Sequence, residues 1–111
     1  MRRGLVKYNG ELAGELLEDV SGEYVFTYDP LFAKKHPDRF ITFNMPVTTR
    51  PYRSKQLFPF FDGLIPEGWL LNIATRSWKI NPNDRMGLLL ACCQNAIGAV
   101  SVHPVNTPEN E

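Results

Sequence analysis

The side chains of this sequence that could do chemistry do not form the sets that catalysis or metal binding requires. His36 and His103, the two histidines, have no cysteine, histidine or carboxylate at metal-ligand spacing. Cys92 follows the apolar run Leu88–Ala91, a setting that raises the pKa of a thiol and favours a structural role over a nucleophilic one. The sequence contains no glycine-rich phosphate loop. We therefore expect no metal, no cofactor and no enzymatic activity.

Two pairs of carboxylates could be taken for general acid–base pairs, but the elements around them offer simpler explanations. Glu11 and Glu15 suit a solvated face of a strand. Glu67 falls in the first turn of a helix predicted to begin at Pro66, where a negative charge complements the helix dipole, and Asp62 lies just before that turn. Neither pair indicates catalysis.

The helix predicted from Pro66 to about Lys79 carries two tryptophans, Trp69 and Trp78, on different faces. At about 100° per residue, Trp78 falls on an apolar stripe, which predicts a core position for it, as also for Phe61 and Leu89 on neighbouring helices. Trp69 lies about 120° from the centre of that stripe by the same geometry, beside Asn72 and Arg76. Its position fits two readings equally: packed under a loop, or exposed as the anchor for a partner.

The elements that must position these residues form an α+β domain, a small antiparallel β-meander packed against three or four helices. Asn9-Gly10 predicts a type I′ hairpin turn, and Gly14 a bulge or a close approach. Asp29-Pro30 predicts a capped helix start, and the pair His36-Pro37 its end. The predicted strands are Leu5–Tyr8, Glu11–Leu17, Glu23–Tyr28, Phe40–Phe43 and Ala99–His103, and Met45–Arg53 is predicted to be a loop. Two further helices are predicted, Ser54–Ile65 and Arg85–Cys93. Pro59 is tolerated in the first of them only if it lies in the first turn, and residues Asn81–Asp84 cap the second.

Composition places the chain among ordinary soluble domains. Its 111 residues, 43% hydrophobic and 22% charged, suit one domain, which we expect over residues 1–105 with a polar tail at 106–111 that reads as a natural end. The formal net charge is zero, and we interpret Arg2-Arg3 as the only basic cluster, too short to carry nucleic-acid binding. No apolar run of about 18 residues or secretory signal is present. Adjacent Cys92 and Cys93 suit a reducing compartment, so we expect a cytoplasmic protein with no nucleic-acid or membrane partner.

Four motifs, in this order and spacing, resemble the N-terminal subdomain of HipA-family serine/threonine kinases. They are the Asn9-Gly10 hairpin with Gly14, the run Phe26-Thr27-Tyr28-x-Pro30, the run Phe58-x-Phe60-Phe61-Asp62-x-Leu64-x-Pro66-Glu67, and Ile97-Gly98-Ala99-Val100. The resemblance covers about residues 4–104. The catalytic part of those kinases has no counterpart here, so the resemblance implies no catalytic residue.

A free-standing subdomain of this kind is similar to HipS-type antitoxins of tripartite HipBST toxin–antitoxin systems. The resemblance implies an antitoxin that binds a HipA-like kinase (HipT) in trans and blocks its active-site cleft, with a HipB-like DNA-binding protein as an indirect partner in a ternary complex. The expected partner-binding residues, anchored by Trp69, are Asp62, Ile65, Pro66, Glu67, Gly68, Trp69, Asn72 and Arg76. The alternatives are a non-inhibitory docking subunit and an N-terminal fragment of a full-length HipA-like kinase.

Overall fold

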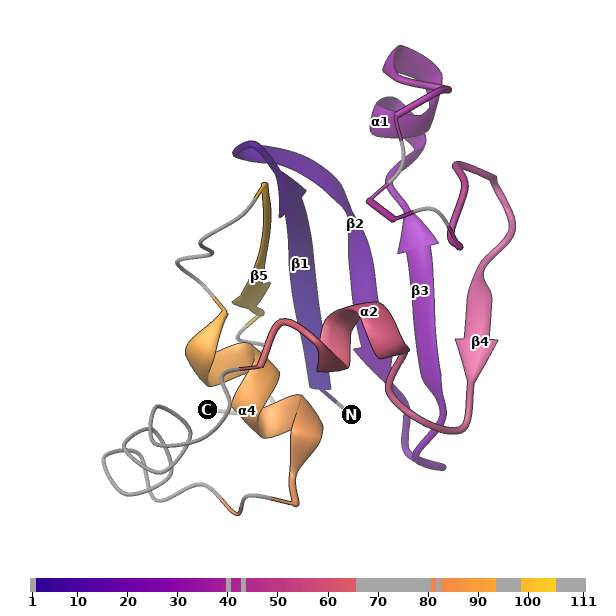
Figure 1. The fold of residues 1–111 in the computed structure, drawn as a ribbon. Coiled ribbons are helices and arrows are strands. Elements are labelled where there is room, and N and C mark those ends of the chain that lie inside the picture. Colours follow the sequence, from indigo (N-terminus) through magenta and orange to yellow (C-terminus); the bar gives the residue numbers. More distant parts are fainter. Residues whose placement is uncertain are drawn as a thin grey trace.

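The computed structural model describes residues 2–39, 41–42, 44–65, 81, 83–93 and 99–105. Within them, five antiparallel strands form one sheet in the order β4-β3-β2-β1-β5. The strands are β1 (Arg2–Tyr8), β2 (Glu11–Glu18), β3 (Tyr24–Tyr28), β4 (Tyr52–Ser54) and β5 (Val100–Pro104), and the helices are α1 (Pro30–Lys35), α2 (Pro59–Asp62) and α4 (Arg85–Cys92). Figure 1 shows α2 and α4 in front of one face of the sheet and α1 beyond one end of it. The predicted α+β meander is confirmed.

The first hairpin forms because two residues accept a left-handed backbone. Asn9 has a φ of 51° and Gly10 a φ of 83°, the positive values that a type I′ turn requires. The Asn9 amide also donates to the Ala99 carbonyl oxygen at 2.7 Å, which joins the turn to the chain entering β5. The sequence prediction for this turn is confirmed.

Gly14 marks both a bulge and a close approach. The β1–β2 register shifts between Val6, which faces Gly14, and Lys7, which faces Leu12. A Cβ atom at Gly14 would lie 2.5 Å from the carbonyl oxygen of Thr27, too close for any other residue without movement of the backbone. Gly14 is therefore constrained by β1 through the bulge and by β3 through the close approach.

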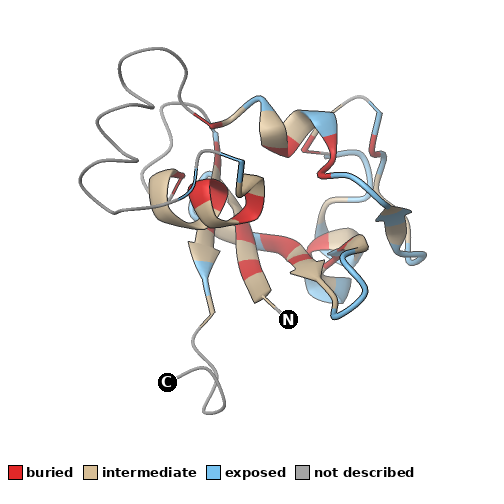
Figure 2. Ribbon diagram, turned by 90° about the horizontal axis from the view of Figure 1, so that it is seen from below, coloured by how far each residue is buried: buried red, intermediate tan, exposed pale blue. Residues whose placement is uncertain are grey.

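The core lies between the sheet and the helices α2 and α4. Val6, Leu16 and Phe26 supply it from three adjacent strands, and Phe61 and Leu89 from the two helices, all with no exposed surface. Figure 2 shows the buried positions concentrated where these elements meet. Phe61 and Leu89 are therefore in the core, as predicted, whereas Trp78 lies outside the described residues.

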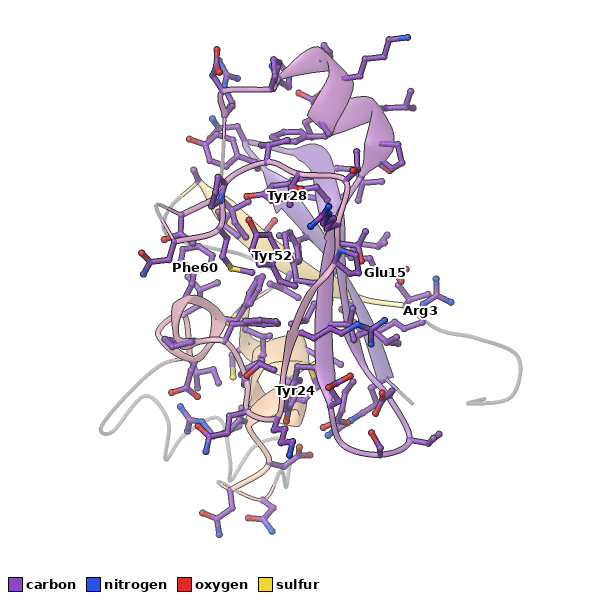
Figure 3. All side chains as sticks on the ribbon, turned by 90° about the vertical axis from the view of Figure 1, so that its right-hand side faces the viewer. Arg3, Glu15, Tyr24, Tyr28, Tyr52 and Phe60 are labelled. Atoms are coloured by element: carbon purple, nitrogen blue, oxygen red, sulfur yellow. The ribbon has the colours of Figure 1, made fainter. Side chains whose placement is uncertain are left out.

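The opposite face of the sheet is only partly apolar. It carries Leu5 and Leu17, with the Arg3–Glu15 ion pair beside them (Nη2–Oε2 2.6 Å). Figure 3 shows Arg3 and Glu15 on the opposite side of the sheet from Phe60. No described helix packs on this face, so the sheet has one core face and one mixed face, a common arrangement for antiparallel sheets.

The predicted fourth strand is wrong. Ile41 and Thr42 form a bend, while Phe40 and Phe43 lie outside the described residues. The Ile41 amide donates to the hydroxyl of Tyr28 at 3.1 Å, so a side chain takes the donor that a neighbouring strand would need. The fourth strand is instead β4, within and just after the predicted loop, with Tyr52 opposite Phe26.

Helix boundaries follow their capping residues. Asp29 accepts hydrogen bonds from the amides of Leu31 and Phe32 at the start of α1, and His36 ends that helix, as predicted. The helix predicted from Ser54 begins later, at Pro59, because Ser54 belongs to β4; Pro59 occupies the first turn, the position that tolerates it.

The last two elements match their predictions closely. Asp84 caps α4 by accepting from the Gly87 amide, and β5 runs one residue later than predicted. Within the described part of the chain, no helix is long and apolar enough to cross a membrane.

Candidate partner-binding site

The candidate site surrounds the corner that follows α2. Of its predicted residues, Asp62 and Ile65 are described, whereas Pro66, Glu67, Gly68, Trp69, Asn72 and Arg76 lie outside the described residues. The structure therefore defines how the chain enters this corner, at residues 58–65, and how it leaves, from residue 83 onward.

The entry to the corner is built on Phe61. Its ring is fully buried, with ring centroids 5.6 Å from Phe26 on the sheet and 5.3 Å from Phe60 in an edge-on contact. The Leu64 amide then donates to the Phe61 carbonyl at 3.0 Å, and the Ile65 amide to the Asp62 carbonyl at 3.2 Å. These bonds tighten the chain after α2, and Ile65, only 3% exposed, packs into the core. In the free chain Ile65 thus holds the corner in place rather than presenting a surface.

Asp62 connects the entry of the corner to its exit. Its Oδ1 accepts a hydrogen bond from Nε of Arg85 at 2.6 Å, which joins the end of α2 to the first residue of α4. About half of the Asp62 side chain remains exposed, so this carboxylate can also face a partner. A second link runs from the Cys93 thiol to the Leu64 carbonyl, with 3.4 Å between sulfur and oxygen.

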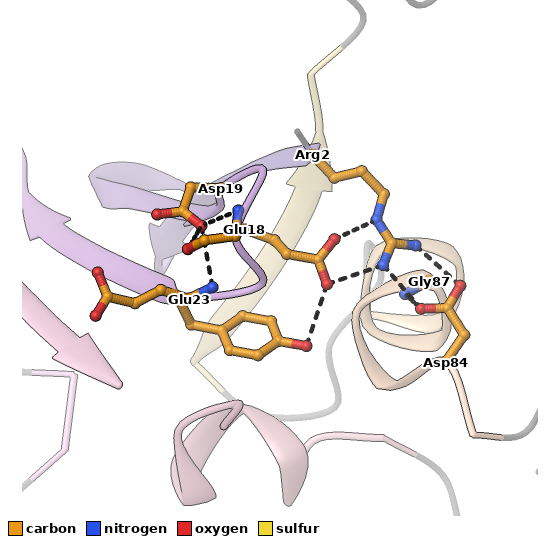
Figure 4. Close-up of polar contacts among 8 residues, drawn as sticks. Arg2, Glu18, Asp19, Glu23, Asp84 and Gly87 are labelled. Atoms are coloured by element: carbon orange, nitrogen blue, oxygen red, sulfur yellow. Dashed lines mark hydrogen bonds and ion pairs between the residues drawn. The ribbon is translucent and has the colours of Figure 1, made fainter. Parts of the chain in front are cut away.

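The start of α4 is held by a network that sequence reasoning missed. The Arg2 guanidinium donates to both Asp84 oxygens at 2.9 Å and to both Glu18 oxygens at 2.7 and 3.0 Å. Asp84 simultaneously caps α4 through the Gly87 amide, and Tyr24 donates to Glu18 at 3.2 Å (Figure 4). Arg2 holds the pKa of Asp84 below its usual value. The only signal in the sequence was Asp84 at a helix start; its partner is 82 residues away.

The two cysteines carry no catalytic signature. Burial raises the pKa of the Cys93 thiol to about 11, and burial also raises that of Cys92. Both are free thiols. Among the described residues, no group of three or more histidine, cysteine or acidic side chains is placed to hold a metal ion. What the described residues provide is a braced corner, with α2 and α4 tied to each other and to the sheet.

Comparisons with known proteins place this geometry in a family. A family model described as the HipA N-terminal domain matches residues 4–103. An uncharacterized protein of Haemophilus influenzae (strain Rd) is 34% identical over 102 residues, covering 92% of each chain. A Sinorhizobium fredii protein provisionally described as kinase Y4mE is 22% identical over 99 residues, which is 89% of this chain but 24% of that protein. The solved structure of an N-terminal domain of HipA toxin superposes with a TM-score of 0.73 at 29% identity, covering 96% of this chain and 95% of that one.

Proposed function

This chain belongs to the HipA N-terminal domain family and is a HipA-related toxin–antitoxin component, and we propose that it is the antitoxin of a HipA-like serine/threonine kinase, which it binds in trans and holds inactive. One observation carries the proposal. The same domain accounts for nearly the whole of the Haemophilus influenzae relative, yet for about a quarter of the longer protein described as a kinase. A domain that occurs both by itself and within a longer chain is suited to act on such a chain from outside.

The proposed mechanism is steric blockade of the kinase cleft by the corner after α2. Trp69 is the anchor, and Gly68 before it lets the backbone of the partner approach closely. Pro66, Glu67, Asn72 and Arg76 surround the anchor. The Asp62–Arg85 ion pair and the buried Ile65 fix the base from which the corner begins.

The proposal includes the cellular setting. The protein is not an enzyme, works in the cytoplasm, and contacts DNA only indirectly, through a HipB-like protein in a ternary complex with the kinase (HipT). The second candidate is a docking subunit, or an N-terminal part of a longer kinase, that completes the kinase fold without inhibiting it. Partial coverage of the longer relative favours this second reading. Adding the purified protein to its kinase separates the two, because an antitoxin lowers autophosphorylation and a docking subunit does not.

Replacement of the anchor tests the mechanism. We expect Trp69→Ala to melt close to the wild type and to fail to protect cells that express the cognate kinase. Loss of an anchor tryptophan costs about 2 kcal/mol or more, which is roughly thirtyfold in affinity. Co-expression survival, kinase-binding affinity and a thermal melt of the variant alone are the measurements.

Val20→Ala is the matched control, because Val20 is an apolar side chain that is 87% exposed in the turn between β2 and β3. We expect it to protect as well as the wild type. If Trp69→Ala protects cells fully, the blockade mechanism is wrong. If the variant unfolds, Trp69 is a core residue and not an exposed anchor.

A further inference from the structure

The zero net charge of this chain conceals a strong separation of charge. Residues 34–55 contain six of the twelve basic residues and one of the twelve acidic ones, a net charge of +5 that the rest of the chain balances with −5. This stretch corrects the expectation that Arg2-Arg3 is the basic cluster to consider. Figure 1 shows α1, the loop after it and β4 on one side of the molecule, beside β3.

The cations of this stretch differ from those elsewhere in how they are paired. Arg2 and Arg85 both bind carboxylates of their own chain. In contrast, among the described residues no ion-pair partner is found for four exposed side chains of the stretch: Lys34, Arg39, Arg50 and Lys55. We call these four residues the basic edge. Positive charges that have no acidic neighbour of their own chain can be neutralised by an acidic partner.

An apolar groove of about 400 Å³ lies within the same part of the chain. Tyr52 of β4 and Phe60 of α2 line it, and both rings lie on the helix side of the sheet (Figure 3). The remaining lining residues are Thr42, Asn44, Met45, Phe58 and Pro59. Its wall is preformed, because the Tyr52 hydroxyl donates to the Pro46 carbonyl at 2.6 Å and the Tyr28 hydroxyl donates to that of Met45. The volume is within the range of sites that receive a bulky side chain.

The third feature is the strand β4 itself, which contributes Tyr52 to this groove. It is three residues long and pairs with β3 on one side, and it is an edge of the sheet among the described residues. An edge strand offers backbone donors and acceptors to an extended peptide, and a neighbouring pocket selects one of its side chains.

From these three features we propose that the basic edge, β4 and the groove form a docking surface for an extended acidic segment of a partner protein. The segment places one bulky apolar side chain between Tyr52 and Phe60, while its carboxylates face Arg50 and Lys55. Nucleic acid is the rival occupant, since phosphates would also satisfy the cations. The groove favours the peptide, because a concave apolar cavity accommodates a side chain, whereas bases stack on open aromatic faces. This surface does not depend on the proposed antitoxin role.

Selection from a displayed library of short random peptides, with the whole chain as bait, tests the proposal. We expect enriched sequences that combine at least two acidic residues with one aromatic or large aliphatic residue. One enriched peptide, labelled with a fluorophore, then serves as the probe in anisotropy titrations. Replacing its bulky residue by serine should weaken binding by at least about tenfold, the loss that follows from withdrawing a large apolar side chain from water-excluding contact.

Charge reversals in the protein provide the matched comparison. Arg50→Glu and Lys55→Glu should each weaken probe binding roughly fivefold to tenfold, because attraction becomes repulsion. Lys7→Glu makes the same charge change on the opposite face of the sheet, where Lys7 faces Ser101 of β5, and should leave probe affinity within about twofold of the wild type. Thermal melts confirm that each variant is folded.

Three results would overturn the proposal. The first is a selection that enriches no peptide, or peptides without acidic residues. The second is a probe whose affinity falls equally with Lys7→Glu and with Arg50→Glu, which means that only net charge matters. The third is tight binding of a random single-stranded oligonucleotide or short duplex, lost in Arg50→Glu, together with no peptide binding; that outcome assigns the surface to nucleic acid.

Discussion

A single guanidinium, that of Arg2, ties three elements of this fold together. It contacts Glu18 on β2 and Asp84 at the start of α4 from its own position on β1. The Asp84 carboxylate receives hydrogen bonds from Arg2 and from the Gly87 amide, which are stronger for the charged form than for the neutral acid. The ionised Asp84 therefore adds a polar link at the start of α4 to the core packing that holds this helix.

This link predicts how stability changes with pH. The pKa of Asp84 is lowered in the folded state by its hydrogen bonds to Arg2, so its contribution is present above its usual pKa of 3.8 and is lost as the pH falls through the lower folded value. Asp84→Asn keeps a cap oxygen but not the charge. We expect this variant to cost roughly 1 kcal/mol at pH 7, a figure kept small because both Asp84 and Arg2 are partly exposed. The cost should shrink as the pH falls below 3.8. Urea titrations of both proteins at several pH values measure this, and an equal difference at pH 7 and pH 2 would exclude the charge as its source.

The thiol of Cys93 gives a second prediction at the scale of one residue. With a pKa raised to about 11 by burial, roughly one Cys93 in a thousand is a thiolate at pH 8, and the side chain is only 4% exposed. We expect iodoacetamide to modify Cys92 first in the native protein and Cys93 only after urea is added. Mass spectrometry of peptides locates the label, and Cys92→Ser isolates the slow site. Rapid native labelling of Cys93 in that variant would show that the contact with Leu64 opens readily.

At the scale of elements, the bulge at Gly14 leaves no room for a Cβ atom. We expect Gly14→Ala to lower the free energy of unfolding by roughly 1–3 kcal/mol, because its Cβ would press on the Thr27 carbonyl at 2.5 Å. Gly63→Ala is the control: Gly63 has a φ of −69° at the end of α2, and a Cβ there would meet its nearest neighbour, the Pro59 carbonyl, at 3.3 Å. Thermal melts of the two variants give the comparison. Because Gly→Ala restricts the unfolded chain, it should by itself be neutral or slightly stabilising at the helical φ of Gly63. An equal loss of stability in both variants would therefore show that the close approach to Thr27 is not the cause.

Elements with a local physical cause could be predicted from the sequence. Asn9-Gly10 defines its own turn, Asp29 its own helix start, and Asp84 the next. The strand expected at Phe40–Phe43 failed because its apolar residues signal burial, which Ile41 satisfies in a bend through a bond to Tyr28. In the same way, β4 was hidden among prolines and polar residues, since its strand form depends on pairing with β3.

In the candidate site too, features with a local cause could be predicted and features that depend on distant residues could not. Phe61 in the core followed from helical periodicity, and the match to the family followed from the order of the motifs. The Asp62–Arg85 pair and the Arg2 network did not, because their partners are 23 and 82 residues apart and no local pattern records such distances. Ile65 shares the helical apolar spacing of Phe61, and the structure buries it in the core.

At the scale of the whole molecule, we expect a protein that acts only through binding. The purified chain should neither bind ATP tightly nor transfer phosphate, because its sequence has neither a phosphate loop nor a kinase catalytic motif. Isothermal calorimetry with ATP and magnesium, alongside a phosphate-transfer assay with the chain alone, measures this. An active HipA-like kinase under the same conditions is the control. A nucleotide dissociation constant in the low micromolar range would contradict a purely binding role.

The two margins of the sheet differ in their capacity to recruit further strands. On β5, the amide of Val102 already donates to the Cys93 carbonyl at 2.8 Å, and Pro104, two residues on, has no amide hydrogen to offer. The margin at β4 is limited differently, because the strand has three residues and Pro51 directly before it has no amide hydrogen either. This short margin can receive an extended acidic peptide, but a second β4 placed against it would also bring Arg50 and Lys55 of both copies together. The charges that attract an acidic strand to this margin therefore oppose the addition of further copies of the molecule itself.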